Sequence, residues 1–211
     1  MTNETMTIHE ALSELKMLDS RINRKIESTS FCEANKHSNS KINGFSIDDY
    51  KKNVVEVYQS INDLIRRRGA IRNALSNSNA ITTITVGGKT YTIAEAIEMK
   101  KTGVDLLENL KLTMTEQYNS ATRRVRMNND ALNEAADRYV QGLYGSKEKS
   151  NSEEINKARE VYVVANTIDF IDPLGIQGEI EKLAEEIETF SHEVDSKISV
   201  SNALTTISIS Y

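Results

Sequence analysis

One apolar pattern in this sequence runs for about 45 residues with helical spacing, and it limits the possible folds more than any other feature. It begins at Thr92-Ile93-Ala94-Glu95, where Thr92 and Glu95 have the spacing of a capping box. A helix of this length measures about 65 to 70 Å and cannot bury its own apolar face. We therefore expect a bundle of long helices, with a bend near Gly103. The apolar positions are Ile97, Val104, Leu107, Met114, Tyr118, Ala121, Val125, Leu132, Ala135 and Tyr139.

Two segments nearer the start of the chain can supply partners for this helix. Thr7 and Glu10 form a second capping box, which predicts a helix from Ile8, and Ser46 predicts the cap of a helix from Ile47. Residues 28–45 between them are rich in Ser, Asn and Lys without periodicity, and we expect a flexible loop. Both segments carry one apolar face: Ile8, Leu12, Leu15, Leu18, Ile22 and Ile26 in the first, and Ile47, Tyr50, Val54, Val57, Ile61, Leu64, Ile71 and Leu75 in the second.

The C-terminal third predicts two more helices. A short one is expected from Ser152, and a long one after Asp172, with Asp172 as its cap and Pro173 in the first helical position. Asn128 interrupts the apolar face of the long central helix, and it either sets the register of a buried seam or is partly exposed. The apolar face of the last helix contains Ile176, Ile180, Leu183, Ile187, Phe190, Val194 and Ile198.

A nine-residue sequence occurs twice. Residues 78–86 read SNAITTITV and residues 201–209 read SNALTTISI, so six of nine positions are identical. Each copy follows an apolar helical face in the same phase, which predicts a change from helix to strand at both places. Asn79 and Asn202 are suited to the turn or left-handed conformation that would end each helix.

The first copy continues into a predicted β-hairpin over residues 81–93. Gly87 and Gly88 separate two alternating runs, a strong signal for a two-residue turn. In that register Ile84 faces Tyr91, and four threonines share the opposite side. A two-stranded hairpin alone is marginally stable, so we expect the C-terminal strand, residues 204–210, to join it from the same chain or from another copy. The small sheet would then cap the helices through residues 78–93 and 201–211.

Composition excludes several classes of protein. The 211 residues include 26 Lys and Arg and 31 Asp and Glu, and the net charge of -5 gives no overall attraction to nucleic acid. The single Cys excludes an intrachain disulfide scaffold. The first residues lack the basic and apolar regions of a secretion signal, so we do not expect export by that route. Apolar runs are far shorter than the roughly 20 residues that a membrane-spanning helix requires.

We find no sequence motif for catalysis. The three histidines are scattered, and Glu188 with His192 would give only two ligands to a metal. Cys32 has no positioned base nearby in the sequence, and Gly87-Gly88-Lys89-Thr90 lacks the upstream glycine of a phosphate loop. We expect no enzymatic activity, no metal and no cofactor.

The candidate site residues are therefore those that would make interfaces. In the sheet cap they are Ile84, Val86, Tyr91, Ile207 and Ile209. In the helix seam they are Val54, Ile61, Leu64, Leu107, Met114, Tyr118, Leu132, Ile180, Leu183, Ile187 and Phe190. A possible basic patch consists of Arg66, Arg67 and Arg68, which could bind phosphate, but a solvated helix face is the more common explanation of such a run.

The order of these motifs resembles a known group of proteins. The opening IHEALSELKMLDSRI helix, the INDLIRRRGAIRNALSNSNAITTITVGGKTYTIAEAI segment, the DPLG junction and the final SNALTTISI strand are similar to uncharacterised helical proteins of phages and prophages of low-GC bacteria. They are more distantly similar to septicolysin-like helical-hairpin proteins. The resemblance implies a helical structural protein made during phage assembly, and it brings no catalytic residue.

These observations lead to one expectation for the whole chain. We expect residues 1–211 to form a single elongated, mainly α domain, an antiparallel helical bundle or coiled coil capped by the small sheet. It would be a noncatalytic component of the virion that binds copies of itself and a capsid, neck or tail protein, in the particle and in the host cytoplasm during assembly. The alternatives are a membrane-active, septicolysin-like protein and a nucleic-acid-binding accessory protein. We expect no small-molecule substrate, nucleic acid or membrane as partner.

Overall fold

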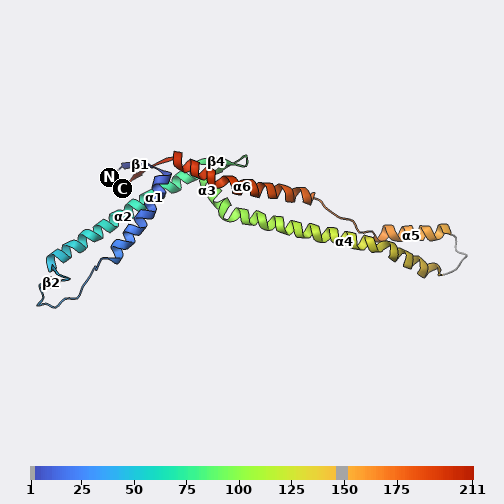
Figure 1. Cartoon of the computed structure of the whole chain (residues 1–211), viewed down its shortest axis with the longest axis horizontal. Helices are drawn as coiled ribbons and strands as arrows, with labels where there is room; N and C mark the ends of the chain where they lie inside the picture. The colour runs from blue at the N-terminus through green and yellow to red at the C-terminus, as the bar shows by residue number, and fades with distance from the viewer. Residues whose placement is uncertain (1–2, 146–151) are drawn as a thin grey trace. The chain divides into compact units, whose positions relative to one another are not determined.

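The computed structural model describes residues 3–145 and 152–211, and it is mainly helical, with 74% of residues in helices (Figure 1). The helices are α1 (Ile8–Glu27), α2 (Ile47–Ile81), α3 (Ile93–Glu98), the π-helical turn η1 (Met99–Gly103), α4 (Val104–Tyr144), α5 (Ser152–Asn166) and α6 (Ile176–Leu204). The strands are β1 (Asn3–Thr7), β2 (Lys41–Ile42), β3 (Phe45–Ser46), β4 (Thr83–Val86), β5 (Lys89–Thr92) and β6 (Thr206–Ser210). The predicted fold class, long helices with small antiparallel sheets, is confirmed.

The chain divides into two compact units, whereas the sequence led us to expect a single domain. Unit 1 contains Met1–Lys101 and Thr189–Tyr211, and unit 2 contains Thr102–Glu188. One boundary falls inside η1, where the regular helix is interrupted just before Gly103, the position at which we expected a bend. The other boundary falls inside α6.

The helix starts follow their capping residues. Both capping boxes form: the Thr7 hydroxyl accepts a hydrogen bond from the Glu10 amide at 3.2 Å, and the Thr92 hydroxyl accepts one from the Glu95 amide at 3.2 Å. Ser46 caps α2 in the same way, through the Asp49 amide. Each cap satisfies an amide at the helix start that has no partner inside the helix.

The predicted ends of α2 and α6 are wrong. Both helices continue through Asn79 and Asn202, and they end two residues later at Ile81 and Leu204. The amide of the next residue still donates to the carbonyl four positions back, Thr82 to Ser78 and Thr205 to Ser201, each at 2.8 Å. Because the helical hydrogen-bond pattern is complete at this point, the asparagines need no left-handed conformation.

The start of α6 also differs from the prediction. Asp172 accepts hydrogen bonds from the amides of Leu174 and Ile176, but the helix begins at Ile176 and not at Pro173. Gly175, with φ of 65°, lies between them and turns the chain into the helix.

The loop expected at 28–45 contains a small hairpin. Strands β2 and β3 pair through Lys41↔Ser46 and Ile42↔Phe45, and Asn43 and Gly44 make the turn with φ of 48° and 86°. An Asn-Gly pair is a preferred sequence for a turn with two positive φ angles, and this signal was missed.

The β4–β5 hairpin is confirmed in the predicted register. Ile84 pairs with Tyr91, and Thr83↔Thr92 and Thr85↔Thr90 place four threonines on one face. Gly87 and Gly88 make the turn with φ of 55° and 76°.

We expect Gly87→Ala to lower the free energy of unfolding by about 2 kcal/mol and Gly88→Ala by about 1 kcal/mol. Both positions require positive φ, but a Cβ at Gly87 would lie 3.2 Å from Cγ2 of Thr189, whereas Gly88 faces open space. Urea denaturation of the two variants measures the difference. Equal losses, or a larger loss at Gly88, would contradict the close approach of α6 to this turn.

The predicted partner of the C-terminal strand is wrong. Strand β6 pairs with β1 and not with the β4–β5 hairpin, in the antiparallel register Thr7↔Thr206, Met6↔Ile207, Thr5↔Ser208, Glu4↔Ile209 and Asn3↔Ser210. The two ends of the drawn chain accordingly lie next to each other in Figure 1. Strand β1 satisfies the edge of β6 directly, so the described residues form three two-stranded sheets and not one shared cap.

The main core of unit 1 lies between α1, α2 and the inner face of β6. Strand β6 alternates exposed and buried residues, and Ile207 and Ile209 are on the buried side. They pack in one cluster with Ile71 and Leu75 of α2, and with residues of α1. The α1 members of the cluster are Ile8, Ala11, Leu15, Leu18 and Ile22.

Unit 2 is held together by contacts of α4 with α5 and with the segment before α6. Tyr139 stacks on Tyr162 with ring centroids 4.5 Å apart, and Tyr118 meets Phe170 edge to face at 5.7 Å. The Asn129 side chain donates to the Ile168 carbonyl at 2.8 Å and accepts from its amide at 3.0 Å. Asn128, the residue considered from the sequence, is exposed and bonds only within its own helix through the Arg124 carbonyl.

Candidate functional site

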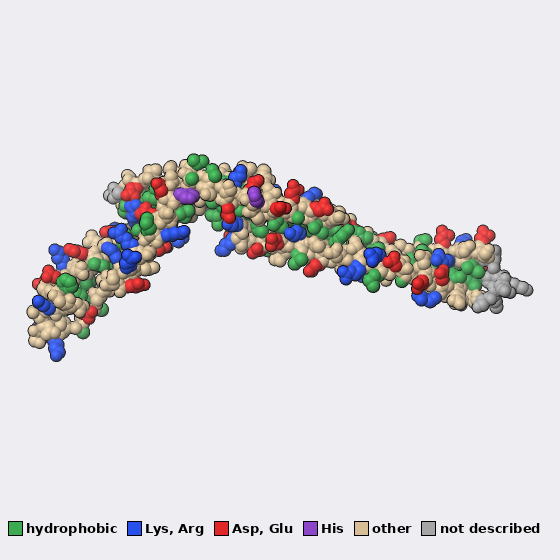
Figure 2. Space-filling model, viewed as in Figure 1, with side chains coloured by type: hydrophobic (Ala, Val, Ile, Leu, Met, Phe, Trp, Pro, Cys, Tyr) green, Lys and Arg blue, Asp and Glu red, His purple; other side chains and the backbone are tan. Residues whose placement is uncertain are grey.

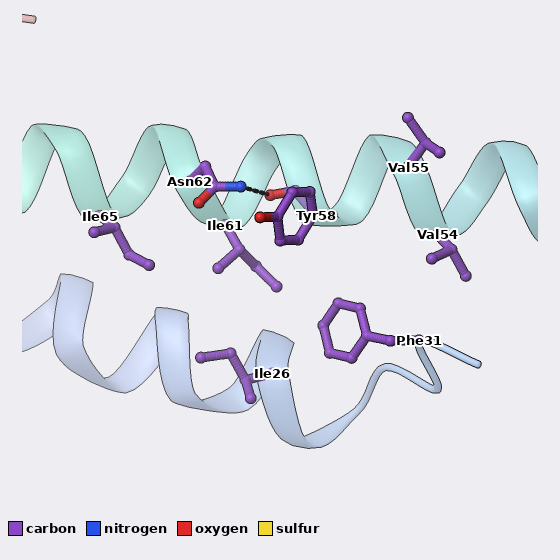
Figure 3. A pocket seen from close by; sticks show the side chains of 8 residues that line it. All are labelled: Ile26, Phe31, Val54, Val55, Tyr58, Ile61, Asn62 and Ile65. Atoms are coloured by element: carbon purple, nitrogen blue, oxygen red, sulfur yellow. Dashed lines mark hydrogen bonds between the residues drawn. The ribbon is translucent and has the colours of Figure 1, made fainter.

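An apolar groove of about 530 Å³ lies in unit 1, between the end of α1 and the first half of α2 (Figure 3). Ile26 from α1 and Phe31 from the segment after it point toward Ile61 of α2. The residues that line the groove are Ile26, Phe31, Val54, Val55, Tyr58, Ile61, Asn62 and Ile65. Seven of these eight side chains are apolar or aromatic, so the groove is suited to an apolar partner and not to a polar substrate.

The groove is open because α2 is longer than α1, and its first half continues past the end of α1 (Figure 1). Val55 and Tyr58 are 63% and 60% exposed, and Val55 points away from α1 in Figure 3. The Asn62 side chain bonds to the Tyr58 carbonyl at 3.0 Å. Apolar side chains exposed together in this way mark an interaction surface more often than isolated ones do.

Two polar contacts fix the walls of the groove. Lys25 of α1 donates to the Ser60 hydroxyl at 2.6 Å, and the Tyr50 hydroxyl donates to the Ser30 carbonyl at 2.9 Å. These bonds tie α1 and the following segment to α2 on either side of the groove. The groove is therefore built by the packing of the helices and is present before any partner binds.

The predicted seam residues lie on inner faces of the helices. Ile61, Leu132, Ile187 and Phe190 are buried. The others are half-buried: Val54, Leu64, Leu107, Met114, Tyr118, Ile180 and Leu183. The eleven residues are divided between the two units. Val54 and Ile61 are the two that also line the groove.

The predicted sheet-cap residues also face inward. Ile84, Val86, Ile207 and Ile209 are buried, and half-buried Tyr91 meets Phe190 edge to face at 5.6 Å. They are divided between the β4–β5 and β1–β6 sheets, where they contact helices of this chain. In the described structure these five side chains are not available as an outer surface.

The three arginines of the possible basic patch do not form a patch. Arg67 lies inside a cluster with Glu4 of β1, Glu14 of α1 and Tyr211, which its guanidinium contacts both at the hydroxyl and over the ring, 4.9 Å from the centroid. Arg68 pairs with Asp19. A phosphate that binds Arg67 or Arg68 would have to displace these carboxylates.

The electrostatic interactions of the Arg67 cluster stabilise the fold. The hydrogen bonds that the Arg67 guanidinium donates to Glu14 and Glu4 raise its pKa further above the usual range, and Arg67 in turn lowers the pKa of Glu4. The Arg67 side chain is 19% exposed, so its charge is largely removed from water and depends on these partners. The cluster connects α2 to both strands of the β1–β6 sheet.

Acidification is expected to destabilise the protein through these groups. The pKa of Glu4 is lowered by Arg67 and that of Asp19 by Arg68, so their stabilising effect is complete above the ordinary values of 4.5 and 3.8 and is lost as pH falls through the lower folded-state values. Melting temperatures measured from pH 6 to pH 3 should therefore fall, and fall less steeply for Arg67→Met. Parallel curves for the two proteins would mean that the cluster does not carry this dependence.

Sequence reasoning missed the outward apolar residues of α2. Val55, Tyr58 and Ile65 were assigned to no seam, because Val54, Val57, Ile61 and Leu64 already formed one. The missed signal was their own spacing of three, four and three positions, with Asn62 between them. That spacing is typical of a second coiled-coil seam on the same helix.

Within residues 3–145 and 152–211, no three His, Cys, Asp or Glu side chains are grouped so that they could hold a metal ion. In the same residues, no helix is both long and apolar enough to span a membrane. Comparisons with protein families, with curated proteins and with solved structures found no match.

Proposed function

We propose that this protein is a noncatalytic assembly component that acts by binding copies of itself through the apolar groove on α2. The observation that carries the proposal is the groove itself, a preformed apolar cavity with a volume of about 530 Å³ whose walls are fixed by hydrogen bonds. Val55, Tyr58 and Ile65 are exposed on this helix face, and a partner that covers such apolar side chains stabilises the complex. The partner of this face is the same face of a second copy.

Exposed apolar side chains on α2 support such a partner. Val55, Tyr58 and Ile65 are 63%, 60% and 46% exposed. Figure 2 shows hydrophobic side chains among the charged ones on the surface of both units. A partner that covers the three side chains of α2 would remove their apolar surface from water.

The sequence of the groove supports a helix as the partner element. Val55, Tyr58, Asn62 and Ile65 have the alternating three- and four-residue spacing of a coiled-coil seam. A single asparagine in such a seam favours one register because it must face a polar partner. Two copies of α2 that pair along this face would bury Val55 and Ile65 and place the Asn62 side chains near each other.

The double variant Val55→Glu/Tyr58→Glu is expected to weaken self-association at least tenfold and to leave the melting temperature of the monomer nearly unchanged. Both side chains are exposed in the single chain, so charges there cost nothing until two copies meet. Sedimentation velocity over a concentration series measures the association. The matched control is Gln59→Glu, an exposed residue of the same helix outside the groove lining. Equal association of both variants and the parent protein would refute the groove as the interface.

We extend the proposal to a setting, the phage particle, on the resemblance of the chain's motifs to phage and prophage proteins. A helical component that assembles with itself and carries no catalytic group fits a role in a capsid, neck or tail. Mass spectrometry of purified particles tests this setting separately. Consistent absence of the protein from particles would refute the setting, while the self-association would still be decided by sedimentation.

A further inference from the structure

A second sequence match accompanies the nine-residue repeat. Residues 5–12 read TMTIHEAL and residues 90–97 read TYTIAEAI, with five of eight positions identical. The nine-residue repeat covers the end of a helix and the strand after it. The match between residues 5–12 and 90–97 covers a strand and the start of the helix after it. Together they divide the chain into half 1, residues 3–86, and half 2, residues 89–210, each of which begins with a strand that leads into a helix and ends with a helix that leads into a strand.

The strand pairs follow the same rule at both places. In the β4–β5 sheet Thr83 pairs with Thr92 and Ile84 with Tyr91; the equivalent residues of the β1–β6 sheet, Thr206 with Thr7 and Ile207 with Met6, pair in the same way. The remaining pairs also correspond: Thr85↔Thr90 with Ser208↔Thr5, and Val86↔Lys89 with Ile209↔Glu4. The two sheets therefore have one register.

The hydrogen bonds that join strand to helix are also equivalent. The Ile93 amide donates to the Thr82 carbonyl at 2.9 Å, and the Ile8 amide donates to the Thr205 carbonyl at 3.0 Å. The Glu95 and Glu10 carboxylates each accept from the cap amide at 2.7 Å, and this bond lowers the pKa of both carboxyl groups.

Burial repeats at several equivalent positions. Ile71 of α2 and Val194 of α6 occupy equivalent places before the repeated sequence, and they are 0% and 1% exposed. Other buried equivalents are Ile84 with Ile207, Val86 with Ile209, Ile93 with Ile8, and Ala96 with Ala11. At the opposite extreme, Ile81 and Leu204 are the equivalent last residues of their helices, and both are strongly exposed.

Neither half forms a strand pair of its own at these places. Half 1 supplies β1 and β4, half 2 supplies β5 and β6, and each sheet takes one strand from each half. The covalent link between the halves is the Gly87-Gly88 turn. The equivalent place in the β1–β6 sheet, between Ser210 and Asn3, has no such link in the described chain.

We propose that the two halves are binding partners held together by two equivalent strand–helix interfaces, and that half 2 of a second copy can replace half 2 of the same chain. The partner is half 2 specifically, because the interfaces differ at one place. Arg67 of half 1 requires Tyr211, which follows β6, and the residue equivalent to Tyr211 after β4 is Gly88. Two copies of half 1 would leave Arg67 without this contact. The proposal does not depend on the α2 groove.

The test uses the full chain with a protease recognition sequence inserted between Gly87 and Gly88, folded first and cut afterwards. We expect the cut protein to keep its helical circular dichroism and its two halves in one particle. Its melting temperature should rise with concentration, because unfolding now separates two molecules. Separation of the halves at micromolar concentration, with either half still folded, would overturn the proposal.

Exchange is measured with one unlabelled and one ¹⁵N-labelled cut protein. After mixing, brief denaturation in urea and refolding, native mass spectrometry should find about half of the particles with one labelled and one unlabelled half, as random re-pairing by mass action requires. Cut protein that carries Ile207→Ala and Ile209→Ala is the control and should lose its pairing. Re-pairing only between halves of equal label, or failure of the parent halves to pair again, would refute exchange.

Discussion

Replacing Ile207 and Ile209 together by alanine is expected to lower the free energy of unfolding by about 5 kcal/mol, since each buried Ile→Ala change costs about 2 to 5 kcal/mol. Both side chains are buried in the cluster that α1 and α2 form over β6. The loss falls on the β1–β6 strand pair, which joins residues about 200 positions apart. Urea denaturation followed by circular dichroism measures it, and the helices should unfold with the strand.

The opposite face of the same strand supplies the control. Thr206 and Ser208 are exposed, and the Ser208 hydroxyl shares a hydrogen bond with the Thr5 hydroxyl at 3.3 Å. Replacing both by alanine should change the free energy of unfolding by less than about 1 kcal/mol, as surface substitutions usually do. Similar losses for the two double variants would mean that β6 does not pack on α1 and α2 with this face.

Arg67→Met is expected to lower the free energy of unfolding by about 2 to 3 kcal/mol. The variant keeps most of the apolar stem but removes the hydrogen bonds to Glu4, Glu14 and Tyr211. Hydrogen bonds to charged groups contribute about 1.5 to 3 kcal/mol each, and hydration of the released partners offsets part of the loss. Hydrogen exchange should show the largest loss of protection in β1 and β6, because Glu4 and Tyr211 belong to or follow these strands.

The neighbouring arginine is a matched control. Arg66 is 70% exposed and pairs with Asp63, one turn away on the same helix. Arg66→Met should therefore cost no more than about 0.5 kcal/mol. Arg67→Lys should restore part of the stability, because a lysine can reach one carboxylate but cannot replace the forked guanidinium. Equal effects at positions 66 and 67 would contradict the cluster.

The parts of the fold that could be predicted from the sequence depend on neighbouring residues. Thr7 with Glu10, and Thr92 with Glu95, mark helix starts because the cap and its partners lie within one turn. The Gly87-Gly88 hairpin followed for the same reason, since its register is fixed by a turn of two residues.

The pairing of β1 with β6 could not be predicted in this way. The match between residues 5–12 and 90–97 was available in the sequence, and it would have assigned β1 as the equivalent of β5. Without it, β6 had two possible partners, and nothing within a few residues distinguishes them. The Arg67 cluster follows from that pairing, because Glu4 and Tyr211 reach Arg67 only when β1 and β6 are together.

The candidate site could be predicted only in part from the sequence. Val54 and Ile61 were identified as seam residues and do line the groove. The openness of the groove depends on the lengths of α1 and α2, 20 and 35 residues, and on the path of the segment between them. Residue spacing fixes which side of a helix is apolar, but the end of a neighbouring helix decides which part of that side stays uncovered.

Self-association is tested most directly by the mass of the purified full-length chain in solution. We predict that sedimentation equilibrium from about 1 to 100 µM gives a weight-average mass that rises toward twice or more the 23.7 kDa of one chain. A mass of one chain across the whole range would contradict the account, whatever the stability of the variants.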